Sequence, residues 1–223
     1  MSLPVLVLEN VTKRRTTAQG EEVTLLHSVD LTVETGSFTA IVGPSGGGKS
    51  TLVRMLNRLD DPTSGRILFN GQDISTVDPL SLRRKVGLVL QKPYMFEGTA
   101  RQNLQRPFQY AGITSAFPEE QKLLECLATC QLPGDILDRT ARNLSIGQQH
   151  RLSLARTILL EPEVLLLDEP TSALDRPTAD RLGQTLRQIG QSLRLTIVMV
   201  THDLRLAGRV ADRLSYIEDG RLL

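Results

Sequence analysis

The first part of the chain alternates hydrophobic and polar residues with a period of two. The segments "LVLENV" (6–11), "LLHSVDLTVE" (25–34) and "SFTAIVG" (37–43) follow this pattern, and turn-forming residues bound each of them. Such alternation is typical of β-strands. Further on, Asn70-Gly71 within "GRILFNGQDI" is a pair that favours a two-residue hairpin turn. We therefore expect strands at these positions and a hairpin at Asn70-Gly71.

Helical periodicity begins after "IVG". In "PSGGGKSTLVRMLNRLDDPTSG" a glycine-rich turn leads into a helix that must end before Pro62. Over residues 99–137 the pattern predicts a helical insertion whose segments are separated by Pro107, Pro118 and Pro133.

Strands and helices then alternate towards the end of the chain. The strands are expected in "EVLLLDEP" and "LTIVMVTHD", and the helices in "ADRLGQTLRQIGQSL" and "LRLAGRVADRL". Short, continuously apolar strands between helices favour a parallel sheet covered on both faces. The pattern thus predicts an α/β fold.

Composition excludes several classes of protein. With 223 residues, of which 40% are hydrophobic, the chain can form one large or two small domains. Its 26 basic and 25 acidic residues leave a net charge of +1, so we expect no nucleic-acid partner. No apolar run approaches the roughly 18 residues of a membrane span, and "MSLPVLVLENVTKRR" lacks a secretory pattern. These features predict a cytoplasmic protein.

Cys126 and Cys130 are four residues apart in a stretch with helical periodicity, so they could share one helix face. A metal site needs more ligands than these two. Since free cysteine is among the most frequently buried residue types, we expect both to be small apolar residues of the core.

The segment "GPSGGGKS" (43–50) fits the phosphate-binding loop pattern G-x-x-x-x-G-K-[ST], with a strand before it and a helix after it. Its glycines let backbone amides surround phosphate oxygens, and the helix directs its positive end towards them. Lys49 is expected to reach the β- and γ-phosphates, and Ser50 to ligate Mg²⁺. A chance glycine-rich turn is the alternative. The nucleotide-binding residues predicted here are Gly43, Pro44, Ser45, Gly46, Gly47, Gly48, Lys49, Ser50 and Thr51.

Two acids, Asp168 and Glu169, follow the apolar strand in "VLLLDEP". Because the carboxyl ends of parallel strands border a nucleotide crevice, Asp168 could hold Mg²⁺ and Glu169 could orient or deprotonate the attacking water. The alternative is that both are ordinary acids at a helix N-terminus. His202 in "VMVTHD" could contact the γ-phosphate, and Gln91 in "VGLVLQKP" could bind a water of the metal or face solvent. The candidate catalytic residues are Lys49, Gln91, Glu169 and His202. The candidate metal ligands are Ser50, Gln91 and Asp168.

The segment "NLSIGQQHRLSLAR" (143–156) opens like a helix, because Ser145 and Gln148 have the spacing of a capping box. Gly147 occupies the first turn, where alanine would favour the helix by ~1 kcal/mol. This choice raises the question of what must approach the helix start so closely.

In this order, the phosphate loop, Gln91, "LSIGQ", "LLLDEP", "SALD" and "THD" resemble the ATPase subunit of an ATP-binding cassette (ABC) transporter over essentially the whole chain. The resemblance implies a P-loop NTPase with a mainly parallel core sheet, an N-terminal antiparallel β subdomain and a helical subdomain. It implies a single domain, 1–223, in which 1–92 and 157–223 form the core with the β subdomain and 93–156 the helical subdomain.

The resemblance also implies roles. Gln91 would belong to the loop that links the nucleotide to the membrane partner, Ser145–Gln148 would be the signature, and Ser172–Asp175 would contact a second copy. His202 would be the switch histidine. The partners implied are an integral membrane transporter subunit and a second copy of the chain in an ATP-sandwich dimer. The implied location is the cytoplasmic face of the inner (plasma) membrane, as a peripheral protein.

The same resemblance answers the question that Gly147 raises. In such a dimer, ATP and Mg²⁺ on one copy are covered by Ser145, Gly147 and Gln148 of the other, so the γ-phosphate is the group that approaches. The free amides and positive end of a helix start favour such an anion.

Two positions depart from the family pattern. Ile146 replaces the first glycine of the usual L-S-G-G-Q; isoleucine accepts helical φ and ψ, so the helix is retained. Arg15 stands about where the family usually places an aromatic residue against adenine. A guanidinium plane can stack on a base, and a solvated loop arginine is the alternative.

Three other functions compete with a transport ATPase. A soluble ABC ATPase of DNA repair or chromosome organisation would carry a long coiled coil, and no sustained heptads are present. A translation-associated ABC ATPase would carry two cassettes, and a P-loop kinase would lack "LSIGQ" and "SALD".

The cargo is the least determined property. "QKPYMFEGTARQNLQRPFQ" and "LPGDILDRTARNLS" resemble the ATPase of bacterial iron-efflux ABC transporters, whereas "NRLDD", "LRRKVGLVLQKP" and "GQQHRLSLAR" resemble phosphate-import ATPases. We expect metal-ion efflux, with phosphate import as the alternative.

Overall fold

The computed structural model describes residues 4–110, 117–172 and 174–223. Within these ranges the strands form two sheets. The first is antiparallel, in the order β2-β1-β4-β5. Its strands are β1 (Pro4–Thr16), β2 (Glu22–Glu34), β4 (Ser64–Phe69) and β5 (Gln72–Asp73). The expected hairpin lies between β4 and β5, where Asn70 (φ 50°) and Gly71 (φ 77°) both have the positive φ of a type I′ turn.

The second sheet has the order β10-β9-β3-β8-β7-β6. Neighbouring strands from β9 to β6 are parallel, and β10 is antiparallel to β9. This arrangement confirms the expected α/β class with a mainly parallel core sheet. Its strands are β3 (Phe38–Val42), β6 (Val86–Val89), β7 (Val164–Asp168), β8 (Thr196–Thr201), β9 (Arg213–Glu218) and β10 (Arg221–Leu222).

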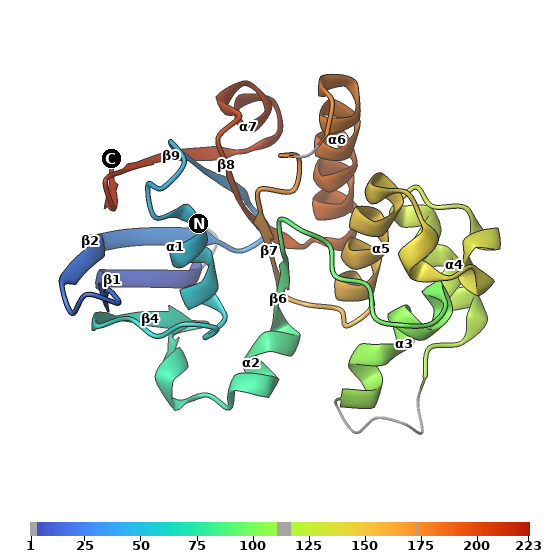
Figure 1. Ribbon diagram of the computed structural model, residues 1–223, viewed down its shortest axis with the longest axis horizontal. Coiled ribbons are helices and arrows are strands. Elements are labelled where there is room, and N and C mark those ends of the chain that lie inside the picture. Colours follow the sequence, from blue (N-terminus) through green and yellow to red (C-terminus); the bar gives the residue numbers. More distant parts are fainter. Residues whose placement is uncertain (1–3, 111–116, 173) are drawn as a thin grey trace.

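The helices cover both faces of this sheet. Figure 1 shows α1 between the two sheets, and α3, α4 and α5 gathered on the side away from β1 and β2. The helices are α1 (Lys49–Leu56), α2 (Pro79–Lys85), α3 (Ala100–Tyr110), α4 (Glu120–Thr129), α5 (Ile146–Ile158), α6 (Arg176–Leu193) and α7 (Leu204–Val210). Short 3₁₀ segments span Ile74–Thr76, Gly134–Asp138 and Ala141–Asn143. In the described part of the chain, no helix combines the length and the apolar character needed to cross a membrane.

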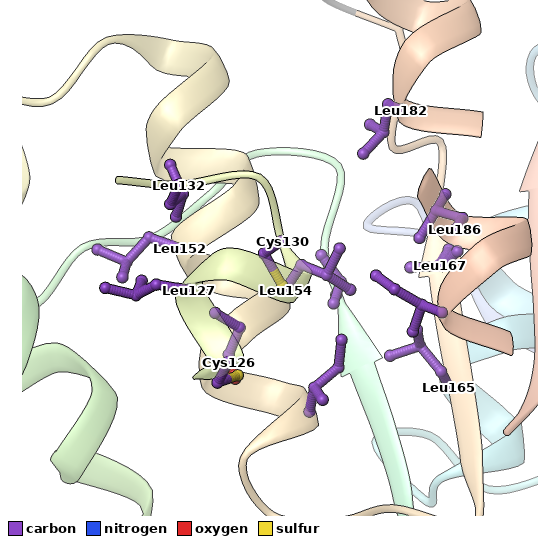
Figure 2. Packing of buried hydrophobic residues seen from close by; sticks show 14 of the residues in the cluster. Cys126, Leu127, Cys130, Leu132, Leu152, Leu154, Leu165, Leu167, Leu182 and Leu186 are labelled. Atoms are coloured by element: carbon purple, nitrogen blue, oxygen red, sulfur yellow. The ribbon is translucent and has the colours of Figure 1, made fainter. Parts of the chain in front are cut away.

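The central strands β3, β7 and β8 are largely apolar because each contributes to two hydrophobic clusters. On β7, Leu165 and Leu167 pack in the cluster beneath α3–α7, whereas Val164 and Leu166 pack in the cluster shared with α1 and the antiparallel sheet. Successive side chains of a strand point to opposite faces, so both faces of the sheet are buried at these central strands. Figure 2 shows the first cluster, in which Leu182 and Leu186 of α6 lie beside the β7 leucines.

The cysteines behave as expected: Cys126 is 8% exposed, Cys130 is fully buried, and both are free thiols. Cys126 lies in α4 and Cys130 follows its last residue. Figure 2 places both on the side of α4 that faces α5, and the Cys126 thiol donates to the carbonyl of Ala155 in α5 (3.3 Å).

Two expectations from the sequence are wrong. Pro107 does not separate helices, because α3 continues through it to Tyr110. Proline removes one backbone donor late in the helix, and the first turn is fixed independently by buried Asn103, whose amide donates to the carbonyls of Phe96 and Thr99 (both 3.0 Å). Pro118 and Pro133 do lie between helical segments, as expected.

The last helix is also shorter than its periodicity predicts. The pattern "LRLAGRVADRL" predicts a helix through Leu214, but α7 ends at Val210 and Leu214 already belongs to β9. Leu214 pairs with Ala40 of β3, and the side chain of Asp212 accepts a hydrogen bond from the backbone amide of Phe38 (2.9 Å). Pairing along β3 therefore outweighs the local helical pattern.

Candidate functional site

The phosphate loop connects β3 to α1, and its conformation requires glycine. Gly46 (φ 84°) and Gly48 (φ 99°) have left-handed backbone conformations that side chains disfavour. At Gly48 a Cβ atom would also lie 2.7 Å from Cδ2 of Leu26, and at Gly43 it would lie 2.0 Å from the carbonyl oxygen of Ile217. Glycine is therefore needed both for backbone freedom and for close packing.

Lys49 is the first residue of α1, and its side chain is buried against its own loop. The ammonium donates to the carbonyls of Gly43 (2.9 Å) and Pro44 (2.8 Å). It also lies 3.4 Å from Oε1 of Glu169. The loop thus holds a cation against its own carbonyl groups, where it could stabilise a bound anion.

The two acids at the end of β7 take different positions. Asp168 is 3% exposed, and its Oδ1 accepts a hydrogen bond from the Ser50 hydroxyl (2.8 Å). Glu169 has a positive φ of 45°, which is uncommon for a residue with a side chain, and its backbone amide donates to the carbonyl of Val200 (2.9 Å). The two neighbouring carboxylates therefore have different partners. Asp168 contacts Ser50, whereas Oε2 of Glu169 lies 3.0 Å from Nδ1 of His202.

The oxygens of Ser50 and Asp168 fit a magnesium ion. Mg²⁺ prefers octahedral oxygen ligands at ~2.1 Å, so two adjacent ligands lie ~3 Å apart. The observed separation of 2.8 Å matches this spacing, and one of the two oxygens belongs to a buried carboxylate. Among the described residues, no three or more His, Cys, Asp or Glu side chains are grouped so that they could hold a metal ion. Mg²⁺ at phosphate sites typically takes one or two protein ligands and keeps several waters.

Gln91 lies two residues beyond β6, on the same edge of the sheet. Its side-chain amide donates to the hydroxyl of Ser172, in the loop between β7 and α6 (3.1 Å). Of Ser172–Asp175, Ala173 lies outside the described residues. Gln91 is exposed, so the loop after β6 is accessible to water and to the loop before α6.

The helix start at Ser145 has the expected capping box. Ser145 Oγ accepts from the amide of Gln148 (3.3 Å), and Gln148 Oε1 accepts from the amide of Ser145 (3.0 Å). Ile146 is 56% exposed, and a Cβ atom at Gly147 would meet nothing within 4 Å. Among the residues that the structure describes, therefore, no packing requires glycine at this position.

The structure brings only part of the predicted site together. Lys49, Ser50, Asp168, Glu169 and His202 are linked by direct contacts. In the ranges that the structure covers, no hydrogen bond or ion pair joins Ser145–Gln148 to the phosphate loop. Arg15 lies exposed near the end of β1, opposite Val23 of β2, and is likewise not bonded to the loop.

Sequence reasoning missed a cationic aromatic cluster at the start of the helical insertion. The guanidinium groups of Arg106 and Arg156 lie 5.3 and 5.1 Å from the ring centroid of Phe96, and Tyr94 packs edge-on against the same ring at 5.1 Å. Burial lowers the pKa of Arg156, whose guanidinium donates to the carbonyl of Tyr94. The only signal in the sequence is the aromatic composition of "PYMF", because the two arginines come from distant segments.

A glycine-rich loop after a strand of a parallel sheet, with a carboxylate at the end of a second parallel strand beside its serine, defines a P-loop nucleoside triphosphatase. The family model described as "ABC transporter" matches residues 26–172. The chain belongs to the ABC transporter family and is an ATP-binding, ATP-hydrolysing domain of it.

Individual relatives agree with this assignment. Protein STAR1 of Oryza sativa subsp. japonica is 42% identical over 210 residues, which are 94% of this chain and 59% of that protein. Phosphate import ATP-binding protein PstB 1 of Nitrosococcus oceani is 40% identical over 86% of this chain and 72% of its own length. The chain spans 34% of the macrolide export ATP-binding/permease protein MacB 2 of Aeromonas hydrophila.

Among solved structures, the dimeric ATP-binding cassette MJ0796 in a post-hydrolysis state, bound to ADP and Pi, superimposes with a TM-score of 0.86. It is 32% identical, and the match covers 97% of this chain and 96% of that one.

Proposed function

We propose that this chain is the ATPase subunit of a transporter and drives solute movement through a separate membrane subunit. The observation that carries the proposal is the convergence of Lys49, Ser50, Asp168 and Glu169 at one edge of the parallel sheet. The location that follows is peripheral, at the cytoplasmic face of the membrane. Residues 93–156 then correspond to the helical subdomain, with the remainder as the core.

Each residue at this edge has a separate role in the proposal. The amides of the loop and Lys49 bind the phosphates, while Ser50 and Asp168 hold Mg²⁺, which would neutralise phosphate charge. Glu169 accepts a proton from the attacking water, His202 positions Glu169 and contacts the γ-phosphate, and Gln91 binds a water of the metal. The opposing copy supplies Ser145, Gly147 and Gln148; support comes from the similar MJ0796 cassette, which is dimeric.

Magnesium dependence tests the core of this proposal. We expect phosphate release by the purified chain to require Mg²⁺, and Ser50→Ala to raise the half-saturating Mg²⁺ concentration by roughly ten- to hundredfold. Ser75→Ala, which removes an exposed hydroxyl after β5, is the control and should leave it unchanged. An unchanged Mg²⁺ requirement in Ser50→Ala would contradict the proposed ligand set.

For cargo we propose metal-ion efflux, specifically of iron, on the family resemblance of residues 91–109 and 132–145. Phosphate import is the second candidate, because proteins named as phosphate import ATPases are 40% and 34% identical to this chain. Relatives named for methionine and glycine betaine transport have similar identity, so identity alone does not separate the cargoes.

Deletion of the gene distinguishes the two candidates. Under metal efflux, cellular iron and sensitivity to peroxide should rise while phosphate uptake stays normal. Impaired phosphate uptake with unchanged iron would support import instead. Co-purification of a membrane subunit with the tagged chain would identify the partner. If the tagged chain were absent from the membrane fraction, the transport proposal itself would be contradicted.

A further inference from the structure

A cavity of about 190 Å³ lies between α5 and α6, away from the contacts that join Lys49, Ser50, Asp168 and Glu169. Its polar lining comes from Gln131, from His150 and Arg151 of α5, and from Thr178, Arg181 and Thr185 of α6. The residues that line it include two leucines but no aspartate or glutamate. The cavity is therefore polar and cationic without an acid of its own.

His150 is the unusual member of this lining. It is only 5% exposed, and no hydrogen bond or ion pair to its side chain occurs within residues 4–110, 117–172 and 174–223. Burial lowers its pKa, which agrees with an imidazole that lacks a carboxylate partner. Among the described residues, neither ring nitrogen of His150 is a fully enclosed atom without a partner, so the unbonded nitrogens are open to solvent and can bond to a ligand in the cavity.

The two arginines also have unused donors. Arg151 donates through Nε to the carbonyl of Gly147 (3.3 Å), which fixes the guanidinium along α5. In the part of the chain that the structure covers, neither terminal nitrogen of Arg151 and no side-chain nitrogen of Arg181 has a protein partner. Thr185 already donates to the carbonyl of Arg181 (2.9 Å), which leaves Thr178 as the free hydroxyl.

We propose that this cavity binds a small oxyanion, such as phosphate, sulfate or a short dicarboxylate, between Arg151, Arg181 and His150. Guanidinium groups match oxyanion geometry through paired N–H donors, and the His150 imidazole adds a third donor, which is charged only when the ring is protonated at low pH. The volume corresponds to about six water molecules at ~30 Å³ each, which suits such an ion and is too small for a nucleotide. An anion here would bridge α5 and α6 by binding Arg151 on the first helix and Arg181 on the second.

The charged and titratable groups around His150 determine how binding depends on pH. The charged groups that line the cavity with it are Arg151 on its own helix and Arg181 on α6. On its other side, the His150 side chain faces apolar residues of β6, β7 and α6 together with Pro170. Since the anion favours the protonated ring, binding should be tighter at low pH.

The chain has three histidines, so ring signals in NMR spectra report on His150 directly. The experiment uses Lys49→Ala protein without nucleotide, which makes the result independent of the proposed ATPase role. We expect sulfate, compared with chloride at equal ionic strength, to shift the His150 signals saturably, with roughly tenfold tighter binding at pH 6 than at pH 8. Sulfate keeps its charge over this range, and phosphate at pH 6 should compete with it.

Arg181→Gln should weaken sulfate binding at least tenfold. Arg181 is exposed, so this variant should fold normally, as unchanged His27 signals and circular dichroism would verify. Arg139→Gln is the matched control, because Arg139 is also exposed and lies outside the cavity lining. Absence of a saturable shift at His150, or equal affinity in the two variants, would overturn the proposal.

Discussion

Oε2 of Glu169 lies 3.0 Å from Nδ1 of His202, although the two residues follow different strands of the core sheet. The other carboxylate oxygen of Glu169 lies 3.4 Å from the Lys49 ammonium. Glu169 is thus placed between the group that binds phosphate and a histidine that is half exposed to solvent. Lys49 and His202 thus hold Glu169, the proposed general base, in a position that a water molecule can still reach.

Replacing this carboxylate should separate binding from hydrolysis. We expect Glu169→Gln to bind Mg-ATP with nearly normal affinity while phosphate release falls by roughly 10²- to 10⁴-fold, because the water loses its base. With Mg-ATP the variant should elute as a dimer in gel filtration. Glu119→Gln, an amide substitution at an exposed residue before α4, is the control and should behave as wild type. A variant that stays monomeric while the wild type hydrolyses ATP would contradict the sandwich arrangement.

In the proposed dimer, Lys49 binds the nucleotide of its own copy and Ser145 contacts the nucleotide of the other copy. Substitutions at these two residues should therefore cause different defects. Lys49→Ala should lose ATP binding, because the ammonium within the loop is removed. Ser145→Arg should leave ATP binding by the isolated chain nearly intact and abolish hydrolysis, since Ser145 would serve the nucleotide of the opposing copy. Equilibrium binding and phosphate release distinguish the two. Equal losses of affinity would show that both residues act on the same nucleotide.

Gly147→Ala should make the isolated chain more stable and less active. A Cβ atom there meets no other atom within 4 Å, and alanine favours a helix over glycine by ~1 kcal/mol. We therefore expect a slightly higher melting temperature and a reduced rate of ATP hydrolysis, because in the proposed dimer the methyl group would occupy the space through which the γ-phosphate approaches. Full activity in the stabilised variant would mean that nothing approaches the helix start closely.

Selectivity for the base should be small. Arg15 is exposed, and of the residues described none bonds its side chain to the phosphate loop. If the triphosphate and Mg²⁺ supply most of the affinity, the preference for ATP over GTP should not exceed roughly tenfold, about 1.4 kcal/mol. Competition binding measures this ratio. A much larger preference would show that another residue recognises adenine.

Features set by local sequence were predictable. The capping box at Ser145, the hairpin at Asn70-Gly71 and the end of α1 before Pro62 all depend on residues a few positions apart, and the structure has each of them. The proximity of Ser50 and Asp168 was predictable for a different reason, because parallel strands end at the same edge of a sheet.

Features set by packing between distant segments were not predictable. The end of α7 depends on pairing with β3, and the cluster around Phe96 requires Arg106 and Arg156 to arrive from different helices. The cavity beside His150 likewise depends on how α5 packs against α6. Periodicity records which side of an element is apolar, but not which neighbour will cover it.

Adjacent side chains of β7 belong to different hydrophobic clusters, with Leu165 and Leu167 in one and Leu166 in the other. Inserting or deleting one residue in this strand would exchange the two sets and move the following carboxylates by ~3.3 Å along the strand. The register of β7 is therefore fixed by two packed interiors at once. The position of Glu169 relative to Lys49 follows from leucine packing along the whole strand, so a distance within the proposed catalytic site is maintained by residues outside that site.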